Sequence, residues 1–245
     1  MTDNTHHGSL LIVGASRGLG HAMAQEFLRH GWQVTGTVRG DNTPLHQLAW
    51  EYGKRLQLER LDICEETQLD ALRQRLAGRR FDMLFVNAGI TNRDPTQTIG
   101  EVSTQEFMQV MLTNALAPMR VIERLAERVA DDGLIGVMSS GQGSVANNHT
   151  GQRELYRGSK AALNMFMRSF AARQHGGARA LVTMAPGWIN TELGGADAPL
   201  TIEQTIPQLV RVLLAKRSGR GWNTWTTSGE PCRGKGSSGR TPLLR

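Results

Sequence analysis

Cysteine is scarce in this chain of 245 residues, which contains only Cys64 and Cys232. Two cysteines so far apart supply neither a disulfide framework nor the paired spacing of a structural zinc site. Their scarcity suits a reducing compartment, and we expect a cytoplasmic location. The seven histidines are scattered, and the His6-His7 pair in a polar terminus does not indicate a ligand set. We therefore predict no metal centre.

Long apolar runs are also lacking. No segment approaches the roughly 20 apolar residues that span a bilayer, so we expect no membrane association. Residues 1–9 are polar and lack the apolar core of a secretory signal. A length of 245 residues suits one large α/β domain with a sizeable core.

The excess of positive charge is confined to the C-terminus. The formal net charge is +6, and residues 216–245 carry seven lysines and arginines against the single acidic residue Glu230. Residues 1–215 therefore balance, with no basic excess to follow a phosphate backbone. We expect no nucleic-acid partner, because such a role would depend on the tail alone.

A glycine-rich turn follows the first apolar run, residues 10–13. Its sequence is Gly14-Ala15-Ser16-Arg17-Gly18-Leu19-Gly20, and a helical segment begins directly after it. Glycines allow close approach of a pyrophosphate to the backbone, and a helix N-terminus offers free N–H groups and a positive dipole end. The spacing Gly-x-x-x-Gly-x-Gly differs from the Gly-x-Gly-x-x-Gly dinucleotide pattern. An ordinary strand–helix turn is the alternative.

A tyrosine and a lysine stand four residues apart, at Tyr156 and Lys160. On a helix this spacing places both side chains on one face. An ammonium near a phenol favours the phenolate, so we expect Lys160 to lower the Tyr156 pKa. Such a pair can serve as a general acid or base for a carbonyl or alcohol oxygen.

Short apolar runs alternate with helix-length segments along the chain. The expected strands are residues 10–13, 34–38, 56–61, 83–86, 134–138 and 180–184, and a long amphipathic helix is expected over 104–129. This alternation predicts an α/β fold: one doubly wound, Rossmann-like parallel sheet in a single domain. Ligands of such sheets bind beyond the carboxyl ends of the strands.

The combined motifs resemble the short-chain dehydrogenase/reductase family from about residue 10 to about residue 215, and within it the C-factor-like and small carbonyl reductase branch. The matching elements are the turn at 14–20, Asp62, Asn87-Ala88-Gly89, Asn114, Ser139-Ser140, Tyr156, Lys160 and Pro186-Gly187-Trp188-Ile189-Asn190-Thr191.

The resemblance implies four catalytic residues. Tyr156 would protonate the substrate carbonyl, and Lys160 would hold the nicotinamide ribose as well as tune Tyr156. Ser140 would bond to the carbonyl oxygen, with Ser139 and Ser144 as competitors for that role. Asn114 would position a water molecule, although it could simply be a polar residue on a long helix.

The resemblance also implies a nicotinamide cofactor. Asp62 would bind the adenine, Asn87 would anchor the ribose region and Thr191 would meet the carboxamide, while Asp62 as a helix cap is the alternative. The full expected set is Gly14, Ser16, Arg17, Gly18, Leu19, Gly20, Arg39, Asp62, Ile63, Asn87, Ala88, Gly89, Tyr156, Lys160, Pro186, Gly187, Ile189 and Thr191.

Charge at the second strand end predicts which cofactor is preferred. Arginine there accommodates a 2′-phosphate, whereas an acidic residue favours a free ribose hydroxyl. Arg39 occupies that position and Arg17 lies in the glycine turn, so NADP(H) is favoured over NAD(H). Asp41 weakens this interpretation, and two ordinary surface arginines are the alternative.

The predicted function is an NADP(H)-dependent oxidoreductase that moves hydride between nicotinamide and a small carbonyl or alcohol, with Tyr156 as general acid/base. The alternative is a nucleotide-sensing regulatory protein with little turnover. The resemblance implies a homodimer or homotetramer, paired through the helices around 104–129 and 156–175.

The C-terminal segment departs from this family pattern. We assign residues 8–215 to the NAD(P)-binding domain and 216–245 to a basic, atypical tail that is disordered or frameshifted. Read from the third base of the Gly221 codon, the genetic code permits Leu-Glu-His-Leu-Asp-Tyr, which resembles the ending of relatives. The sequence of the source gene decides between a genuine tail and a shifted frame.

Overall fold

The computed structural model describes residues 8–174, 177–217 and 221–226, and in this part of the chain seven parallel strands form one sheet. The strand order is β3-β2-β1-β4-β5-β6-β7. The strands are β1 (Ser9–Val13), β2 (Gln33–Val38), β3 (Leu56–Arg60), β4 (Phe81–Val86), β5 (Val129–Met138), β6 (Ala180–Ala185) and β7 (Gly221–Thr226). The order reverses between β1 and β4, which is where a doubly wound sheet opens a crevice for ligands.

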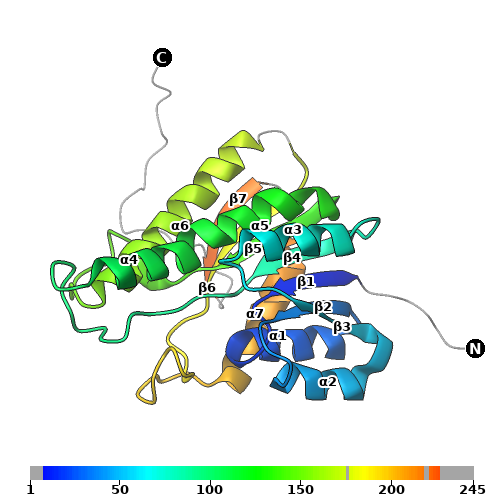
Figure 1. The fold of residues 1–245 in the computed structure, drawn as a ribbon, viewed down its shortest axis with the longest axis horizontal. Coiled ribbons are helices and arrows are strands. Elements are labelled where there is room, and N and C mark those ends of the chain that lie inside the picture. The colour runs from blue at the N-terminus through cyan, green and yellow to red at the C-terminus, as the bar shows by residue number, and fades with distance from the viewer. Residues whose placement is uncertain (1–7, 175–176, 218–220, 227–245) are drawn as a thin grey trace, which may run out of the picture.

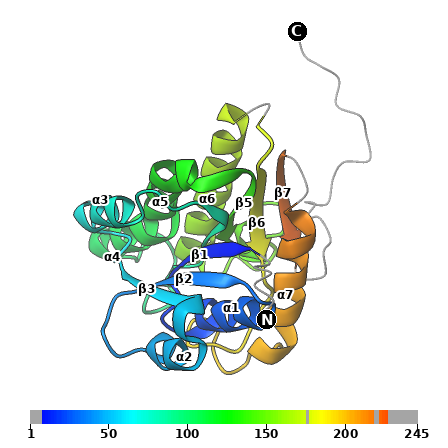
Figure 2. The same cartoon turned by 90° about the vertical axis from the view of Figure 1, so that its right-hand side faces the viewer.

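Helices cover both faces of the sheet (Figure 1, Figure 2). One face carries α1 (Gly18–Arg29), α2 (Pro44–Tyr52) and α7 (Ile202–Lys216); the other carries α3 (Glu66–Arg75), α4 (Thr104–Met111), α5 (Ala117–Leu125) and α6 (Glu154–Arg173). Short 3-10 turns lie at Gly53–Arg55, Ala126–Arg128 and Gly141–Gly143.

Alternation along the strands builds two hydrophobic cores. In β1, Leu10 and Ile12 join the core under α1 and α7, whereas Leu11 and Val13 join the core under α5 and α6. Successive side chains of a strand point to opposite faces, so a strand covered on both sides needs a continuous apolar run. The doubly wound, single-domain fold predicted from sequence is confirmed.

Two elements differ from the sequence expectation. The helix expected over 104–129 is divided, because a π-helical turn at Leu112–Leu116 separates α4 from α5. The sheet also continues past residue 215, since β7 pairs in parallel with β6 from Ala180↔Gly221 to Ala185↔Thr226. Six residues of the expected tail therefore belong to the sheet, and residues 227–245 lie outside the described part of the chain. Among the described residues, no helix combines the length and the apolarity needed to cross a membrane.

Candidate active site at the carboxyl edge of the sheet

The predicted site residues gather where parallel strands end. Gly14 follows β1, Asn87 follows β4, Ser139 follows β5 and Pro186 follows β6. All these strands run in the same direction, so their carboxyl ends form one edge of the sheet. Segments as far apart in the chain as Gly14 and Pro186 therefore lie along one edge, which the rule for ligand sites of parallel sheets predicts.

The glycine turn is fixed tightly to the end of β4. Asn87 Nδ2 donates to the Gly14 carbonyl oxygen at 2.9 Å, and the Gly14 N–H donates to Thr37 Oγ1 at 2.9 Å. Gly14 has φ +87°, and a Cβ there would lie 2.7 Å from the Ala88 nitrogen. A Cβ at Gly20 would clash with the Gly14 carbonyl oxygen. Both positions therefore require glycine for packing reasons, and Thr37 is a contributor that we did not predict.

The middle glycine of the turn, Gly18, has a different environment. It has φ +56°, and a Cβ there would meet no described atom within 4 Å. It begins α1, whose N-cap residue Arg17 makes no side-chain capping bond to the first turn. The N–H groups of that turn are thus left for an external acceptor beside open space, which fits a pyrophosphate.

The two arginines predicted to select the cofactor are exposed and engaged only at the surface. Arg17 forms an ion pair with Glu192 at 2.5 Å, and Arg39 Nη1 lies 3.9 Å from Asp62 Oδ2. Asp41, the nearby acidic residue that weakens the sequence prediction, pairs with Arg60 at 3.1 Å instead of with Arg39. Exposed pairs of this kind contribute little energy, so both guanidinium groups can exchange their partners for a phosphate.

Asp62 does not cap the following helix. Its Oδ1 accepts a hydrogen bond from the Cys64 N–H at 3.0 Å, while the N-cap position of α3 is Glu65. Asp62 therefore holds the turn after β3 and presents its other oxygen to Arg39. Ile63 beside it is buried.

Tyr156 lies in the first turn of α6 with a phenol that is almost wholly buried, and the Ser140 side chain is near enough to lower the pKa of that phenol. Ser140 Oγ also accepts from the Gln142 N–H at 3.1 Å. Ser139 is turned into the interior, where it donates to Asn164 Oδ1 at 2.6 Å. The structure thus places Ser140, and not Ser139, beside the phenol.

Lys160 and Asn114 lie behind the tyrosine, next to Gly89. The Lys160 Nζ donates to the Met138 carbonyl oxygen at 2.9 Å and is 5.8 Å from the centre of the Tyr156 ring. A Cβ at Gly89 would lie 3.3 Å from both Asn114 Oδ1 and Lys160 Nζ. These groups therefore form one polar cluster at the edge of the sheet.

The amide of Asn114 is fully engaged. It lies in the π-helical turn with no exposed surface, accepts from the Ile90 N–H at 2.8 Å, and donates to the Ile90 carbonyl oxygen at 2.8 Å and to Ser159 Oγ at 2.9 Å. Insertions of this type are frequent at functional sites. Ser159, which sequence reasoning missed, is part of α6, and the bond that it accepts from Asn114 ties the π-helical turn to that helix.

The prediction that Lys160 lowers the Tyr156 pKa is wrong for this structure. Burial raises the pKa of the Tyr156 phenol above its ordinary value, and this outweighs the opposing effects of the Arg153 guanidinium and of the Ser140 hydrogen bond. Burial also lowers the pKa of Lys160 to about 8. Both shifts have one cause, because a buried site disfavours the charged form of each group.

The segment after β6 supplies the last predicted residues. Gly187 has φ +96°, and a Cβ there would lie 2.8 Å from Leu200 Cδ1. Ile189 is buried and bridges to Leu200. Thr191 Oγ1 accepts from the Gly194 N–H at 3.0 Å, so the threonine hydroxyl stabilises the loop that follows.

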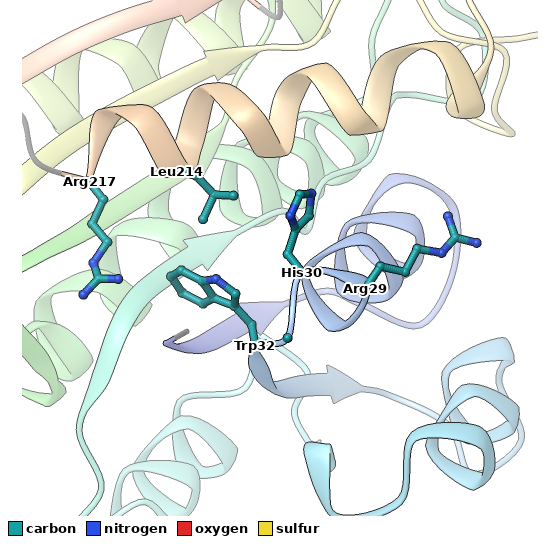
Figure 3. Close-up of a pocket in the computed structure, with 6 residues that line it drawn as sticks. Arg29, His30, Trp32, Leu214 and Arg217 are labelled. Atoms are coloured by element: carbon teal, nitrogen blue, oxygen red, sulfur yellow. The ribbon is translucent and has the colours of Figure 1, made fainter. Parts of the chain in front are cut away.

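A surface hollow of about 580 Å³ lies elsewhere in the fold, lined by Arg29, His30, Gly31, Trp32, Leu214 and Arg217 (Figure 3). It lies where α1 and α7 end and β2 begins, so it adjoins the opposite edge of the sheet. None of the predicted site residues lines it. Arg217 in this hollow pairs with Asp82 at 2.7 Å and lies over the Trp32 ring. Both contacts stabilise the fold.

Comparison with known proteins identifies the family. A model of the short chain dehydrogenase family matches residues 9–199. The chain belongs to this family. It is therefore an oxidoreductase that acts on CH–OH or C=O groups, and the predicted resemblance is confirmed.

Solved structures and curated proteins show where this short chain dehydrogenase lies within the family. A short-chain dehydrogenase/reductase from Burkholderia multivorans with bound NADP is 62% identical, with a TM-score of 0.91, over 92% of this chain and 98% of that one. A carbonyl reductase from Pseudomonas aeruginosa PAO1 in complex with NADP is 35% identical, with a TM-score of 0.85, over 93% and 99%. Protein FixR of Bradyrhizobium diazoefficiens is 30% identical over 211 residues, which cover 81% of this chain and 73% of FixR.

Proposed function

We propose that this short chain dehydrogenase is an NADP(H)-dependent reductase of small carbonyl compounds. The observation that carries the proposal is the buried Tyr156 phenol beside Ser140, one helical turn from buried Lys160, at the edge of the sheet where the glycine turn opens. The NADP bound in two similar structures supports the choice of cofactor.

The residues at the carboxyl edge suit this cofactor. The free N–H groups at the start of α1 would hold the pyrophosphate, and Arg17 and Arg39 would hold the 2′-phosphate. Asn87 keeps the glycine turn in place, and Thr191 lies in the loop that would cover the nicotinamide. The chemistry supplied by the bound nicotinamide is hydride transfer to the carbonyl carbon.

The chain's own residues would handle the proton. Tyr156 Oη would donate it to the carbonyl oxygen as negative charge develops there, and Ser140 Oγ would donate a hydrogen bond to the same oxygen. Because burial raises the Tyr156 pKa, the phenol stays protonated near neutral pH, which suits reduction of a carbonyl. Lys160 would hold the ribose and return a proton, and Asn114 would act as a positioning residue through Ile90 and Ser159.

Turnover tests the proposal directly. Purified protein with NADPH and a panel of small aldehydes and ketones should show oxidation of the cofactor that depends on the carbonyl compound. Tight NADPH binding with no turnover across the panel would instead favour a nucleotide-sensing protein, which is the competing function.

Selection of the cofactor has its own test. Arg39→Asp should lower the preference for NADPH over NADH by about 10- to 100-fold, because a charge-assisted contact to the 2′-phosphate is replaced by repulsion. Arg29→Asp, which changes an exposed arginine at the opposite edge, is the matched control. An unchanged ratio of the two dissociation constants in Arg39→Asp would show that this arginine does not select the cofactor.

A further inference from the structure

Arg153, at the entrance to the helix that carries Tyr156, has an unusual backbone conformation. It is the N-cap residue of α6 with φ 59° and ψ 43°. Among the described residues it is the one non-glycine residue with a positive φ. A side chain in this region costs about 1–2 kcal/mol, which a glycine would avoid. Strained residues of this kind cluster at ligand-binding and catalytic sites.

The Arg153 side chain reaches the predicted proton donor. Its guanidinium carbon lies 5.0 Å from the centre of the Tyr156 ring. Its Nη2 is 3.4 Å from Thr91 Oγ1, which is a long hydrogen bond, and its Nε is buried without a hydrogen-bond partner among the described residues. A planar donor group is thus held beside the reactive phenol with part of its hydrogen-bonding capacity unused.

No carboxylate of the described chain neutralises this cation. Among the described residues, Arg153 forms no ion pair with a carboxylate. Glu154, its neighbour on α6, instead accepts from the Ile99 N–H at 2.8 Å. Arg157, one turn further along, contrasts with Arg153, because it donates to the Gln152 carbonyl oxygen at 2.6 Å and to Thr150 Oγ1 at 3.1 Å.

We propose that Arg153 binds a carboxylate of the substrate, so that the preferred substrates are short oxo acids whose carbonyl group lies within a few carbon atoms of an anionic group. Resting on the reductase function proposed above, this assignment names its substrate class. The guanidinium fork matches a carboxylate in two parallel hydrogen bonds. Anchoring that end of the substrate places the carbonyl oxygen of a short chain near Tyr156 Oη.

Matched acid and ester substrates separate binding of the anion from the chemistry. We would measure kcat and KM with NADPH for 3-oxobutanoate, 4-oxopentanoate and their methyl esters, in wild type, Arg153→Gly, Arg153→Lys and the control Arg157→Gln. Glycine suits the left-handed backbone, so Arg153→Gly should unfold at the same or a higher denaturant concentration than wild type.

Wild type should prefer each acid to its ester. Arg153→Gly should lower kcat/KM for the acids by about 10- to 100-fold, mainly through KM, and leave the esters within about threefold, as expected when a charge-assisted bond is lost. Arg153→Lys should restore part of the loss because it keeps the charge, and Arg157→Gln should behave as wild type.

Other outcomes distinguish the two proposals. Reduction of the esters with no preference for the acids, or an equal loss for acids and esters in Arg153→Gly, would overturn the role of Arg153 while the reductase function stands. If no compound is reduced, the reductase function fails. Calorimetric binding of 4-oxopentanoate to the protein with NADP then decides whether Arg153 forms an anion site. Binding that Arg153→Gly abolishes would support the anion site, and absence of binding to wild type would overturn it.

Discussion

The ammonium group of Lys160 is buried at the carboxyl edge, and the cost of that burial depends on pH. The folded protein holds the lysine with a pKa of about 8, against 10.5 for the ordinary group. Between these values the unfolded chain binds the extra proton, so stability rises with pH across this window. Below about pH 8 the full cost is present in the cofactor-free protein.

Replacing this lysine should therefore have an effect on stability that changes with pH. Wild type should gain stability between pH 7.5 and pH 10, whereas Lys160→Met should not. The free energy of unfolding of Lys160→Met minus that of wild type should therefore be lower at pH 10 than at pH 7.5 by roughly 1–3 kcal/mol, because each pKa unit corresponds to about 1.4 kcal/mol. Urea unfolding at both pH values measures the difference. The exposed Lys54→Met is the control, and equal differences at the two pH values for Lys160→Met would contradict the burial account.

Individual residues also show where sequence reasoning ends. Glycine at positions 14 and 20 was predicted from the motif, and the clashes that a Cβ would cause explain both. Arg153 was not predicted, because neither its left-handed backbone nor its position over Tyr156 has a signal in the local sequence. The Tyr156 pKa shift was predicted in the wrong direction, since sequence gives the distance along a helix but not the burial of the two groups.

At the scale of elements, the strands were predicted well because buried parallel strands are short apolar runs. The division of the 104–129 helix was not predictable from periodicity. Asn114 in the π-helical turn forms hydrogen bonds to Ile90 and Ser159, which belong to other segments of the chain. The same bonds bring α6 and the end of β4 together, so the turn holds the predicted catalytic residues in register.

Removing the Asn114 amide should therefore destabilise the whole domain. Asn114→Ala would leave the Ile90 N–H and carbonyl oxygen and the Ser159 hydroxyl without this partner, at a cost of roughly 2–4 kcal/mol, since each buried unpaired group costs about 1–3 kcal/mol. Gln109→Ala, one turn earlier and exposed, should cost well under 1 kcal/mol. Chemical denaturation measures both, and similar small losses would show that the π-helical turn is not held by these bonds.

The whole molecule presents an apolar surface on two adjacent helices. Phe107 and Met108 of α4 and Met165 and Phe166 of α6 are each more than 40% exposed, and α4 contacts α6. Large exposed apolar groups of this kind mark interaction sites. The homodimer or homotetramer predicted from sequence would bury this surface.

A charge on this surface should break the assembly. We expect Phe166→Glu to convert the oligomer to a monomer while it leaves NADPH binding in place, because a buried unpaired carboxylate is costly at an interface. Sedimentation at micromolar concentration measures the change. Trp50→Glu, at a fully solvated position on α2, is the control, and a wild type that sediments as a monomer would reject the prediction.

The last described strand, β7, lies at the place of the proposed shift of reading frame. Strand β7 occupies Gly221–Thr226, the segment at which we place the proposed shift, and its pairing with β6 involves the backbone. Backbone pairing is available to many sequences, so β7 is compatible with either frame. The sequence of the source gene tests the frameshift proposal, and an early stop in the other frame or the lack of its Leu-Asp-Tyr codons would contradict it.

The central claim is that Tyr156 donates the proton in a reduction that uses NADPH, and replacement of its hydroxyl tests this most directly. Tyr156→Phe should lower kcat for a reducible carbonyl compound by at least about 100-fold, the scale of general acid catalysis, while the dissociation constant for NADPH stays within about threefold. Tyr52→Phe, which changes the chain's other tyrosine, should have no effect on either quantity. A Tyr156→Phe protein that turns over at the wild-type rate would contradict the account.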